Sequence, residues 1–285
     1  MYKSFLVNEF NDRDMIQSMT RNILLLTFLF ILTAENVFSM PMIIAHRGAE
    51  KIAPENTVSS YKKAIEKGAQ ILETDVQMSS DGKLFLMHDY TLNRTTTGKG
   101  NARDYTFKQL KELDAGSWFS ENYKNERIPG LEEVLSLIQG TSLRFILEVK
   151  WTSNDEGLLE KKLGELVKKM KLEKQVYFES FDPNVLERLR KTNPTVEQIY
   201  LANAYIPFLE LFISPHPYWK ELSDTNYELV ELNKSFYWKS IYDRIRVAGK
   251  KLFLWGVDSK EMISRLTSDG VEGIEPTDLD LFKKD

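Results

Sequence analysis

The sequence predicts an α/β fold, a (β/α)8 barrel, from three observations. Short apolar runs rich in β-branched residues alternate with segments of helical period, the pattern of repeated βα units that form a parallel sheet. Eight of these runs fit parallel strands, and each except the last precedes a helical segment. A chain of 285 residues also suits one barrel, because single barrels commonly have about 250 residues.

The eight expected parallel strands are short apolar runs spread along the chain. They are Met42–Ala45, Ile71–Val76, Arg144–Val149, Val176–Glu179, Gln198–Leu201, Tyr227–Leu232, Lys251–Val257 and Val271–Glu275. After the first strand, Thr57 is the expected N-cap of a helix and Gly68 its stop. A later helix carries one apolar stripe for burial, formed by Leu159, Leu163, Leu166, Val167 and Met170.

One further apolar run, Leu84–Met87, does not fit the parallel count. Too few residues join it to the second strand for a parallel crossover, which needs about a dozen, so it should return antiparallel as a hairpin. With the turn centred between Ser80 and Asp81, His88 would face Glu73. That pairing would bring an imidazole beside a carboxylate.

The chain after residue 40 is interpreted as one domain, residues 40–285. It contains no internal repeat, low-complexity tract or linker rich in proline and glycine. Residues 90–130 are expected to form a small insertion over one mouth of the barrel.

The charge and cysteine content exclude several classes of protein. The 38 basic and 42 acidic residues are interspersed and give a formal net charge of -4, so no basic stripe is available to bind nucleic acid. The chain has no cysteine, which excludes disulfides, thiolate metal sites and a cysteine nucleophile. Nucleic acid is therefore not an expected partner.

Residues 1–39 are expected to be a signal peptide or N-terminal leader. The apolar run Ile23–Leu32 is too short to cross a bilayer, which takes about 20 apolar residues, but suits the apolar segment of a signal peptide. Arg21 supplies the positive flank, and Val37 and Ser39 suit a signal-peptidase site. Cleavage after Ser39 would give a periplasmic or secreted protein that begins at Met40 and has no stable membrane span.

Two alternatives remain for this N-terminal segment. Residues 1–20 mix acidic with basic side chains, a poor match to a positive n-region, so Met19 is an alternative start. The apolar run could also be a retained anchor or a helix of a larger fold. In each case, residues 1–39 lie outside the expected barrel.

Polar residues replace apolar ones at the C-terminal ends of three predicted strands. The first strand ends in a histidine and an arginine, the second carries two alternate carboxylates, and the third carries an alternate glutamate and lysine. In that order these residues are His46, Arg47, Glu73, Asp75, Glu148 and Lys150. Alternate residues share one face of a strand, and the active site of such a barrel lies at the C-terminal ends of its strands. We therefore expect the six side chains to meet at one mouth.

The residue types in this group favour metal-assisted phosphoryl chemistry. Glu73, Asp75 and Glu148 offer only carboxylate oxygens, so one hard divalent cation, Ca²⁺ or Mg²⁺, fits better than zinc. Cationic side chains beside the ion would offset charge on a phosphodiester, and His46 and His88 would serve as acid and base. The third histidine lies in a proline-containing segment and receives no role.

A series of ordered motifs resembles the glycerophosphodiester phosphodiesterase family. They are IIAHRG, APENT, ETDVQMSSDGKLFLMHD followed by TLNRTT, LEVK, DAGSWF, ERIPGLEEVL, VYFESFDP and FLWGVD, and the resemblance extends over residues 42–278. Several motifs in the expected order are more specific than any single tripeptide. The resemblance implies a TIM-barrel enzyme that hydrolyses glycerophosphodiesters to glycerol 3-phosphate and an alcohol.

The resemblance also implies a role for each matching residue. It implies two histidines that act as acid and base, three carboxylate metal ligands, two cations that bind phosphate, and a tryptophan that lines the pocket for the glycerol or the leaving group. In that order these residues are His46 and His88, then Glu73, Asp75 and Glu148, then Arg47 and Lys150, and last Trp255.

The sequence departs from the family near its end. Family members often read W-T-V-N where this chain has Trp255 to Asp258, and Glu275 and Pro276 look inserted before Thr277. These changes affect the last two strands, which help to shape the alcohol pocket. The resemblance therefore indicates the type of reaction better than it indicates the alcohol of the substrate.

Two alternative functions and one question of mechanism are open. The first function is that of a lysophospholipase D, or of a phospholipase acting at a membrane face, on the same scaffold. Such an enzyme would need an apolar mouth, which residues 205–213 could supply, although a barrel helix explains these residues as well. A surface binding protein would use the barrel without catalysis. Within the enzymatic interpretation, either water attacks phosphorus directly or the glycerol hydroxyl attacks first to give a cyclic phosphate.

Overall fold

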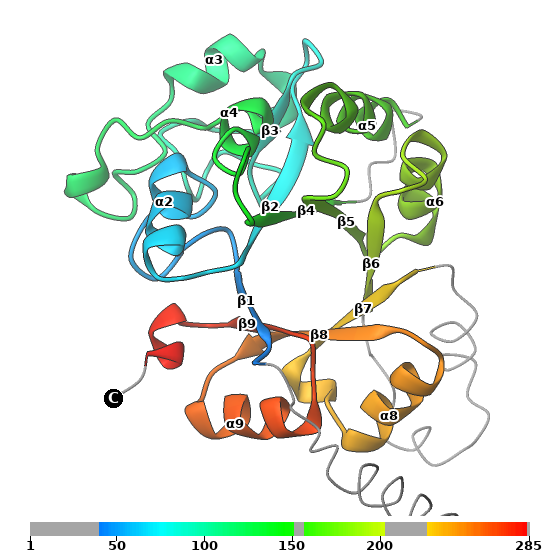
Figure 1. Ribbon diagram of the computed structural model, residues 1–285. Coiled ribbons are helices and arrows are strands. Elements are labelled where there is room, and N and C mark those ends of the chain that lie inside the picture. The colour runs from blue at the N-terminus through cyan, green and yellow to red at the C-terminus, as the bar shows by residue number, and fades with distance from the viewer. Residues whose placement is uncertain (1–39, 151–156, 203–226, 284–285) are drawn as a thin grey trace, which may run out of the picture. The chain divides into compact units, whose positions relative to one another are not determined.

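In the computed structural model, eight parallel strands close into a barrel (Figure 1). The described residues are 40–150, 157–202 and 227–283, and they belong to one compact unit, Met40–Asp285. The strands of the ring are, in order, β1 (Met42–Ala45), β2 (Ile71–Met78), β4 (Arg144–Val149), β5 (Val176–Ser180), β6 (Glu197–Ala202), β7 (Leu229–Asn233), β8 (Lys251–Val257) and β9 (Gly273–Pro276). Because β1 pairs with both β2 and β9, the ring is closed and the predicted fold is confirmed.

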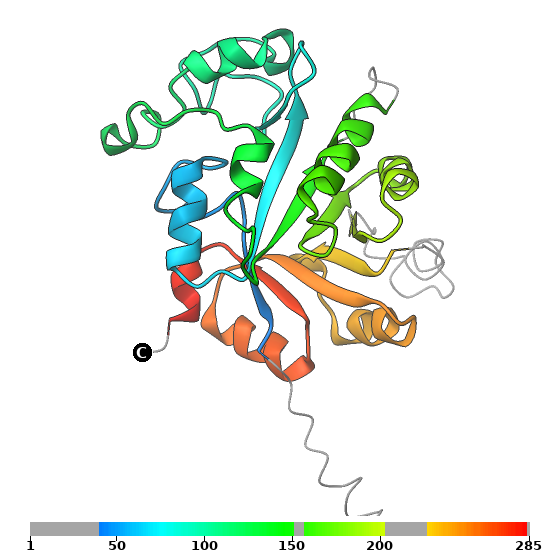
Figure 2. The same ribbon diagram turned by 45° about the horizontal axis from the view of Figure 1, so that its top comes forward.

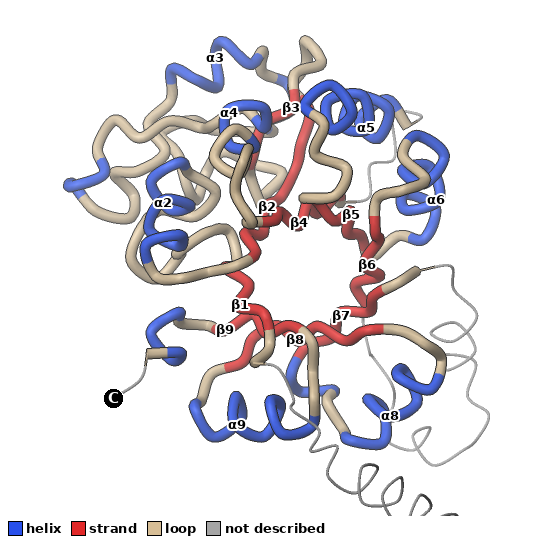
Figure 3. Tube along the Cα trace, in the orientation of Figure 1, coloured by secondary structure: helices blue, strands red, loops and turns tan. Residues whose placement is uncertain are grey.

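Helices surround the ring (Figures 1 and 3). They are α2 (Val58–Glu66), α4 (Leu131–Leu135), α5 (Leu158–Met170), α6 (Pro183–Thr192), α8 (Lys239–Val247) and α9 (Lys260–Asp269), and the 3-10 helices η4 (Lys234–Phe236) and η5 (Leu279–Phe282) follow β7 and β9. The predicted start of α2 is confirmed, since the Thr57 side chain accepts a hydrogen bond from the Ser60 N–H. The helix expected after β6 falls in residues 203–226, outside the described residues.

The apolar stripe of α5 faces the barrel as expected. Leu159, Leu163 and Val167 are buried, and Leu166 and Met170 are partly buried against the same core. Burial of a full aliphatic side chain is worth about 1.5–3 kcal/mol, which explains why a helix rich in lysine and glutamate elsewhere forms here.

The interior of the barrel has an apolar floor. It is formed by one side chain from each of seven strands, each at most 1% exposed: Ile44, Ile71, Ile146, Tyr177, Ile199, Leu229 and Phe253. Because the side-chain period of a strand is two, the residues two positions later point into the same interior, nearer the C-terminal ends of the strands. Most of these are polar, so the floor separates a polar layer from the opposite mouth.

The hairpin after β2 forms, but its predicted register is wrong by one residue. β3 (Leu84–Leu86) pairs antiparallel with β2, with Val76 opposite Leu86. The three-residue loop ends at Gly82, whose φ of +75 is the left-handed conformation of a hairpin with a glycine bulge. This odd-numbered loop centres the turn on a residue rather than between two, so His88 does not pair with Glu73.

The insertion after β3 has a small core of its own. It contains η1 (Ala102–Asp104), α3 (Phe107–Glu112) and η2 (Glu121–Tyr123). Apolar residues of the segment pack on the side chains of β3 and its extension, in the cluster Phe85, Met87, Leu92, Ala102, Leu110, Ala115 and Ile128. Figures 1 and 2 show the insertion beside the hairpin at the edge of the ring. Its packing on β3 explains that position.

Strand β8 is irregular near its C-terminal end. Trp255 pairs with Glu275 and Val257 with Pro276, so β8 carries one extra residue there, Gly256. Gly256 has φ +76, a conformation that glycine adopts without strain. The bulge lies on β8, and the apparent insertion of Glu275 and Pro276 in β9 stays a prediction. Within the described ranges, no helix is both long and apolar enough to span a membrane.

Candidate active site

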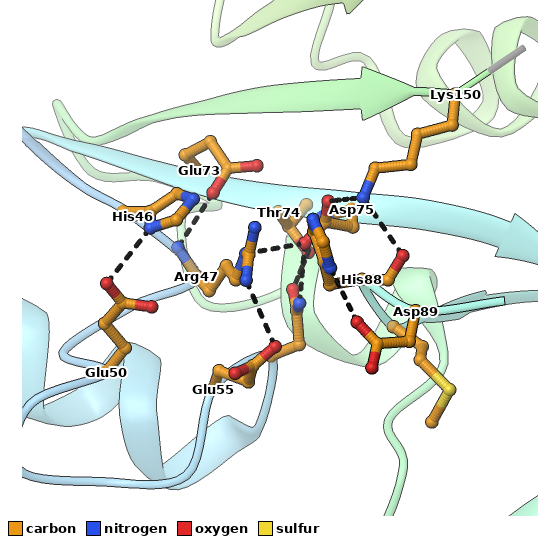
Figure 4. Close-up of polar contacts among 12 residues, drawn as sticks. His46, Arg47, Glu50, Glu55, Glu73, Thr74, Asp75, His88, Asp89 and Lys150 are labelled. Atoms are coloured by element: carbon orange, nitrogen blue, oxygen red, sulfur yellow. Dashed lines mark hydrogen bonds and ion pairs between the residues drawn. The ribbon is translucent and has the colours of Figure 1, made fainter. Parts of the chain in front are cut away.

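The polar layer of the barrel lines one cavity at the C-terminal ends of the strands. Its lining residues are His46, Arg47, Glu73, His88, Glu148, Lys150, Glu179, Phe181, Leu201, Glu231, Trp255 and Glu275. Seven of the eight site residues expected from the sequence are among them, and the eighth, Asp75, is 1% exposed and forms ion pairs with Arg47 and Lys150. Figure 4 shows six of the expected side chains converging from β2 and from the segments after β1, β3 and β4: His46, Arg47, Glu73, Asp75, His88 and Lys150.

Three carboxylates of this group form a candidate cation site. One oxygen each of Glu73, Asp75 and Glu148 lies within 4.8 Å of the others, and all three residues are buried. Glu73 Oε1 and Glu148 Oε1 have no hydrogen-bond partner. Burial, together with the charge of Asp75, raises the pKa of Glu148 to about 8 and raises that of Glu73 well above its usual value. Unpaired buried carboxylate oxygens at this spacing suit a hard divalent cation.

Asp75 also holds the two cations of the site. Its carboxylate lies 2.9 Å from Lys150 Nζ and 3.1 Å from Arg47 Nε, and it accepts a 2.8 Å hydrogen bond from Asn56 Nδ2. Burial acts to raise the pKa of Asp75, but Lys150 and Arg47 lower it well below its usual value. Asp75 is therefore ionised and fixes both phosphate-binding candidates toward the cavity.

His46 follows β1 and lies between two carboxylates. Its Nδ1 is 3.1 Å from Glu50 Oε1, and its Nε2 is 3.9 Å from Glu275 Oε1. Burial acts to lower the pKa of His46, but the charge of Glu275 and the hydrogen bond to Glu50 raise it to about 10. His46 is therefore a protonated imidazolium at neutral pH.

His88 has a different environment. Its Nδ1 is 2.8 Å from Asp89 Oδ1, and its backbone carbonyl accepts a 3.0 Å hydrogen bond from Lys150 Nζ. Burial lowers the pKa of His88 below 6.5 and outweighs the opposing effects of Asp75 and Asp89. The neutral ring that results can accept a proton, so the two histidines differ in charge near pH 7.

Strained backbone surrounds the site on the β1 side. Arg47 and Asn56 have φ of +51 and +56, in the left-handed region that non-glycine residues rarely adopt. The Arg47 N–H donates a 2.8 Å hydrogen bond to Glu73 Oε2, and Asn56 binds Asp75. Asn56 thus orders the mouth through its side chain, while the adjacent Thr57 caps α2.

The chain is similar to known proteins over most of its length. Residues 46–278 match the Glycerophosphoryl diester phosphodiesterase family. The chain belongs to this family. It is 36% identical over 240 residues to the glycerophosphodiester phosphodiesterase of Caldanaerobacter subterraneus subsp. tengcongensis, a match that covers 82% of this chain and 92% of that protein. The glycerophosphodiester phosphodiesterase of Bacillus subtilis is 31% identical over 264 residues, 85% of each chain.

The solved structures show the same fold. A phosphodiesterase of Oleispira antarctica, solved in complex with the product sn-glycerol-3-phosphate, is 26% identical and superimposes with a TM-score of 0.75 over 85% of this chain and 95% of that one. A glycerophosphodiester phosphodiesterase of Agrobacterium tumefaciens has the same fold, with a TM-score of 0.71 at 24% identity over 85% of this chain and 99% of that one. As a member of this family, the protein is a phosphoric diester hydrolase.

One residue of the TLNRTT motif has contacts that the sequence did not reveal. The Arg94 guanidinium donates hydrogen bonds of 2.6 and 2.8 Å to Glu55 and of 2.8 and 2.9 Å to Asp89. Glu55 in turn accepts from Arg47, and Asp89 contacts His88. Arg94 thus connects the segments that carry the two histidines of this phosphodiesterase.

Sequence reasoning also missed three buried glutamates of the cavity. Glu179, Glu231 and Glu275 lie on β5, β7 and β9 and are 3%, 1% and 6% exposed, and the first two each come two residues after a floor position. Burial and the charge of Glu275 raise the pKa of Glu231 to about 8. The signal was present, because each glutamate interrupts an apolar strand at an interior position.

Some expectations concern residues outside the described part of the chain. These are the leader, residues 1–39, the apolar run 205–213 and the third histidine, His216.

Proposed function

We propose that this family member hydrolyses glycerophosphodiesters to glycerol 3-phosphate and an alcohol with the help of one divalent cation. The observation that carries the proposal is the buried cluster of Glu73, Asp75 and Glu148 beside a cavity that is also lined by one cationic and one neutral histidine. The names of the relatives agree with this substrate class.

The cation would be held by the three carboxylates and would be Ca²⁺ or Mg²⁺. When bound, it would offset negative charge that develops on the phosphoryl oxygens. Arg47 and Lys150, already oriented by Asp75, would bind the remaining phosphate oxygens. Trp255 would line the pocket for the glycerol or the leaving group.

The charge states of the histidines suggest their roles. His46, whose pKa is about 10, would protonate the leaving alcohol as general acid. His88, whose pKa is lowered, would take a proton from the nucleophile, either water or the glycerol hydroxyl of the substrate. Its Nδ1 contact with Asp89 would keep Nε2 free for this proton.

A turnover assay with three substrates tests the proposal. Glycerophosphocholine and glycerophosphoethanolamine should release glycerol 3-phosphate, measured with a coupled dehydrogenase. Lysophosphatidylcholine should react more slowly, because the cavity lining is largely charged. Faster turnover of lysophosphatidylcholine would favour lysophospholipase D activity, and no turnover of any of the three would contradict enzymatic function.

We also propose that residues 1–39 are an export leader and that the mature protein is periplasmic or secreted. The support is the short apolar run before Ser39 and the start of the barrel unit at Met40. Mass spectrometry of the exported fraction should find an N-terminus at Met40. An intact Met1 in the cytoplasmic fraction would contradict export.

A further inference from the structure

The wall of the cavity opposite the cation site is both acidic and aromatic. Figure 3 shows β7 and β8 across the ring from β2 and β4. The near wall carries the carboxylate triad with Arg47 and Lys150. The far wall carries Glu231 of β7 and Trp255 of β8. Between the two walls, β5 adds Glu179, and Phe181 follows directly after β5.

The cations around the cavity are already paired with other carboxylates. Arg47 and Lys150 contact Asp75, and Arg47 also contacts Glu55. His46 lies between Glu50 and Glu275. In the described residues none of these three cations forms an ion pair with Glu179 or Glu231, although the charge of His46 acts on Glu231.

Glu179 and Glu231 are buried without a donor. In the described part of the chain, neither forms an ion pair, and both oxygens of Glu231 and one of Glu179 have no hydrogen-bond partner. The strongest charges acting on Glu179 come from other carboxylates, Glu231 first and Glu148 next. The two carboxyl groups lie close enough to share a hydrogen bond, which requires a proton on one of them. Such groups are costly to bury unless a ligand supplies the missing partner.

A second divalent cation fits this pair poorly. Hard cations take six or more oxygen ligands, and among the described residues the only three acidic groups that converge on one point are Glu73, Asp75 and Glu148. Phe181, which is 39% exposed, and Trp255 add aromatic surface on the same side. Carboxylate together with aromatic faces is the combination that recognises organic ammonium groups.

We propose that the preferred substrate is a glycerophosphodiester whose alcohol carries a positive charge, an amine or a quaternary ammonium, and that Glu179, Glu231 and the aromatic pair bind this charge. The inference rests on the proposed function and specifies its substrate class. The phosphate would lie at the triad, and the cationic end would extend across the cavity toward β7.

The test compares substrates that differ in the charge of the alcohol. The wild-type protein is assayed on glycerophosphocholine, glycerophosphoethanolamine and the neutral analogue glycerophosphoglycerol. The expected preference for the two cationic substrates in kcat/KM is about tenfold or more, the usual worth of one charge-assisted contact. Glu231→Gln, which keeps the shape and removes the charge, should lower kcat/KM for cationic substrates by about 10- to 100-fold. Its effect on glycerophosphoglycerol should be smaller by about tenfold or more, since that alcohol carries no charge to bind.

Controls separate this inference from the proposed function. Glu261 is an exposed residue of α9, and Glu261→Gln makes the same change in net charge as Glu231→Gln. This control should leave kcat/KM unchanged for both the cationic and the neutral substrates. Glu179→Gln is a second test of the same pair if Glu231→Gln does not fold. Choline and ethanolamine alone should inhibit the wild-type protein competitively and the Gln variants less.

Two results would overturn the inference. One is equal wild-type turnover of cationic and neutral substrates, and the other is an equal loss on both classes in Glu231→Gln. Either result would leave the proposed hydrolase activity intact, whereas failure to hydrolyse all three diesters would contradict that activity instead.

Discussion

Chelation of divalent cations is expected to abolish turnover, and Ca²⁺ or Mg²⁺ should restore it better than Zn²⁺. The three proposed ligands are carboxylates, which prefer hard cations, and two of their buried oxygens have no partner in the protein. A cation that binds only the folded state should also raise the melting temperature with concentration. Full activity in excess chelator would contradict the metal assignment.

Single substitutions at the cation site should reproduce the chelated state. Glu73→Gln and Glu148→Gln each keep the side-chain shape, so the protein should stay folded while turnover falls by about 100-fold or more, as expected when a charge that acts on the transition state is lost. Glu165→Gln, an exposed residue of α5, is the matched control and should keep wild-type turnover. Normal activity in both site variants, with no response to Ca²⁺, would show that the triad is not the cation site.

Much of the site could be predicted from the sequence because its charges interrupt apolar strands. Burial of a carboxylate such as Glu73 within a strand destabilises the fold, so its presence there indicates a functional role. The period of two then assigns Glu73 and Asp75 to one face, as the structure has them. Fold and candidate site therefore followed from the same pattern.

Other features depended on geometry that the sequence does not encode locally. The hairpin register depends on the positive φ of Gly82. The number of residues between two strands does not reveal this backbone conformation. Glu179 and Glu231 became neighbours only because the sheet closes into a ring, which brings β5 and β7 to one cavity. Arg94 meets Glu55 across 39 residues of chain, through the folding of the insertion. Each of these required tertiary structure.

The histidines should be needed in opposite protonation states, and the pH profile of kcat/KM should therefore be bell-shaped. Activity should rise with pH as His88, whose pKa is below 6.5, loses its proton and becomes a base. It should fall at high pH as His46, whose pKa is about 10, loses the proton that it donates. In His46→Ala the alkaline limb should disappear, and in His88→Ala the acid limb should.

The size of the loss and a change of leaving group separate the two roles. His46→Ala and His88→Ala should each lower kcat by about 10² to 10⁴, and the double variant should lose less than the product, because the two act as one unit. His216→Ala is the control and should be nearly silent. A diester of p-nitrophenol needs little protonation as it leaves, so His46→Ala should recover activity on it while His88→Ala should not. Wild-type turnover of glycerophosphocholine by both single variants would refute the acid and base assignment, and catalysis would then rest on the cation and Arg47.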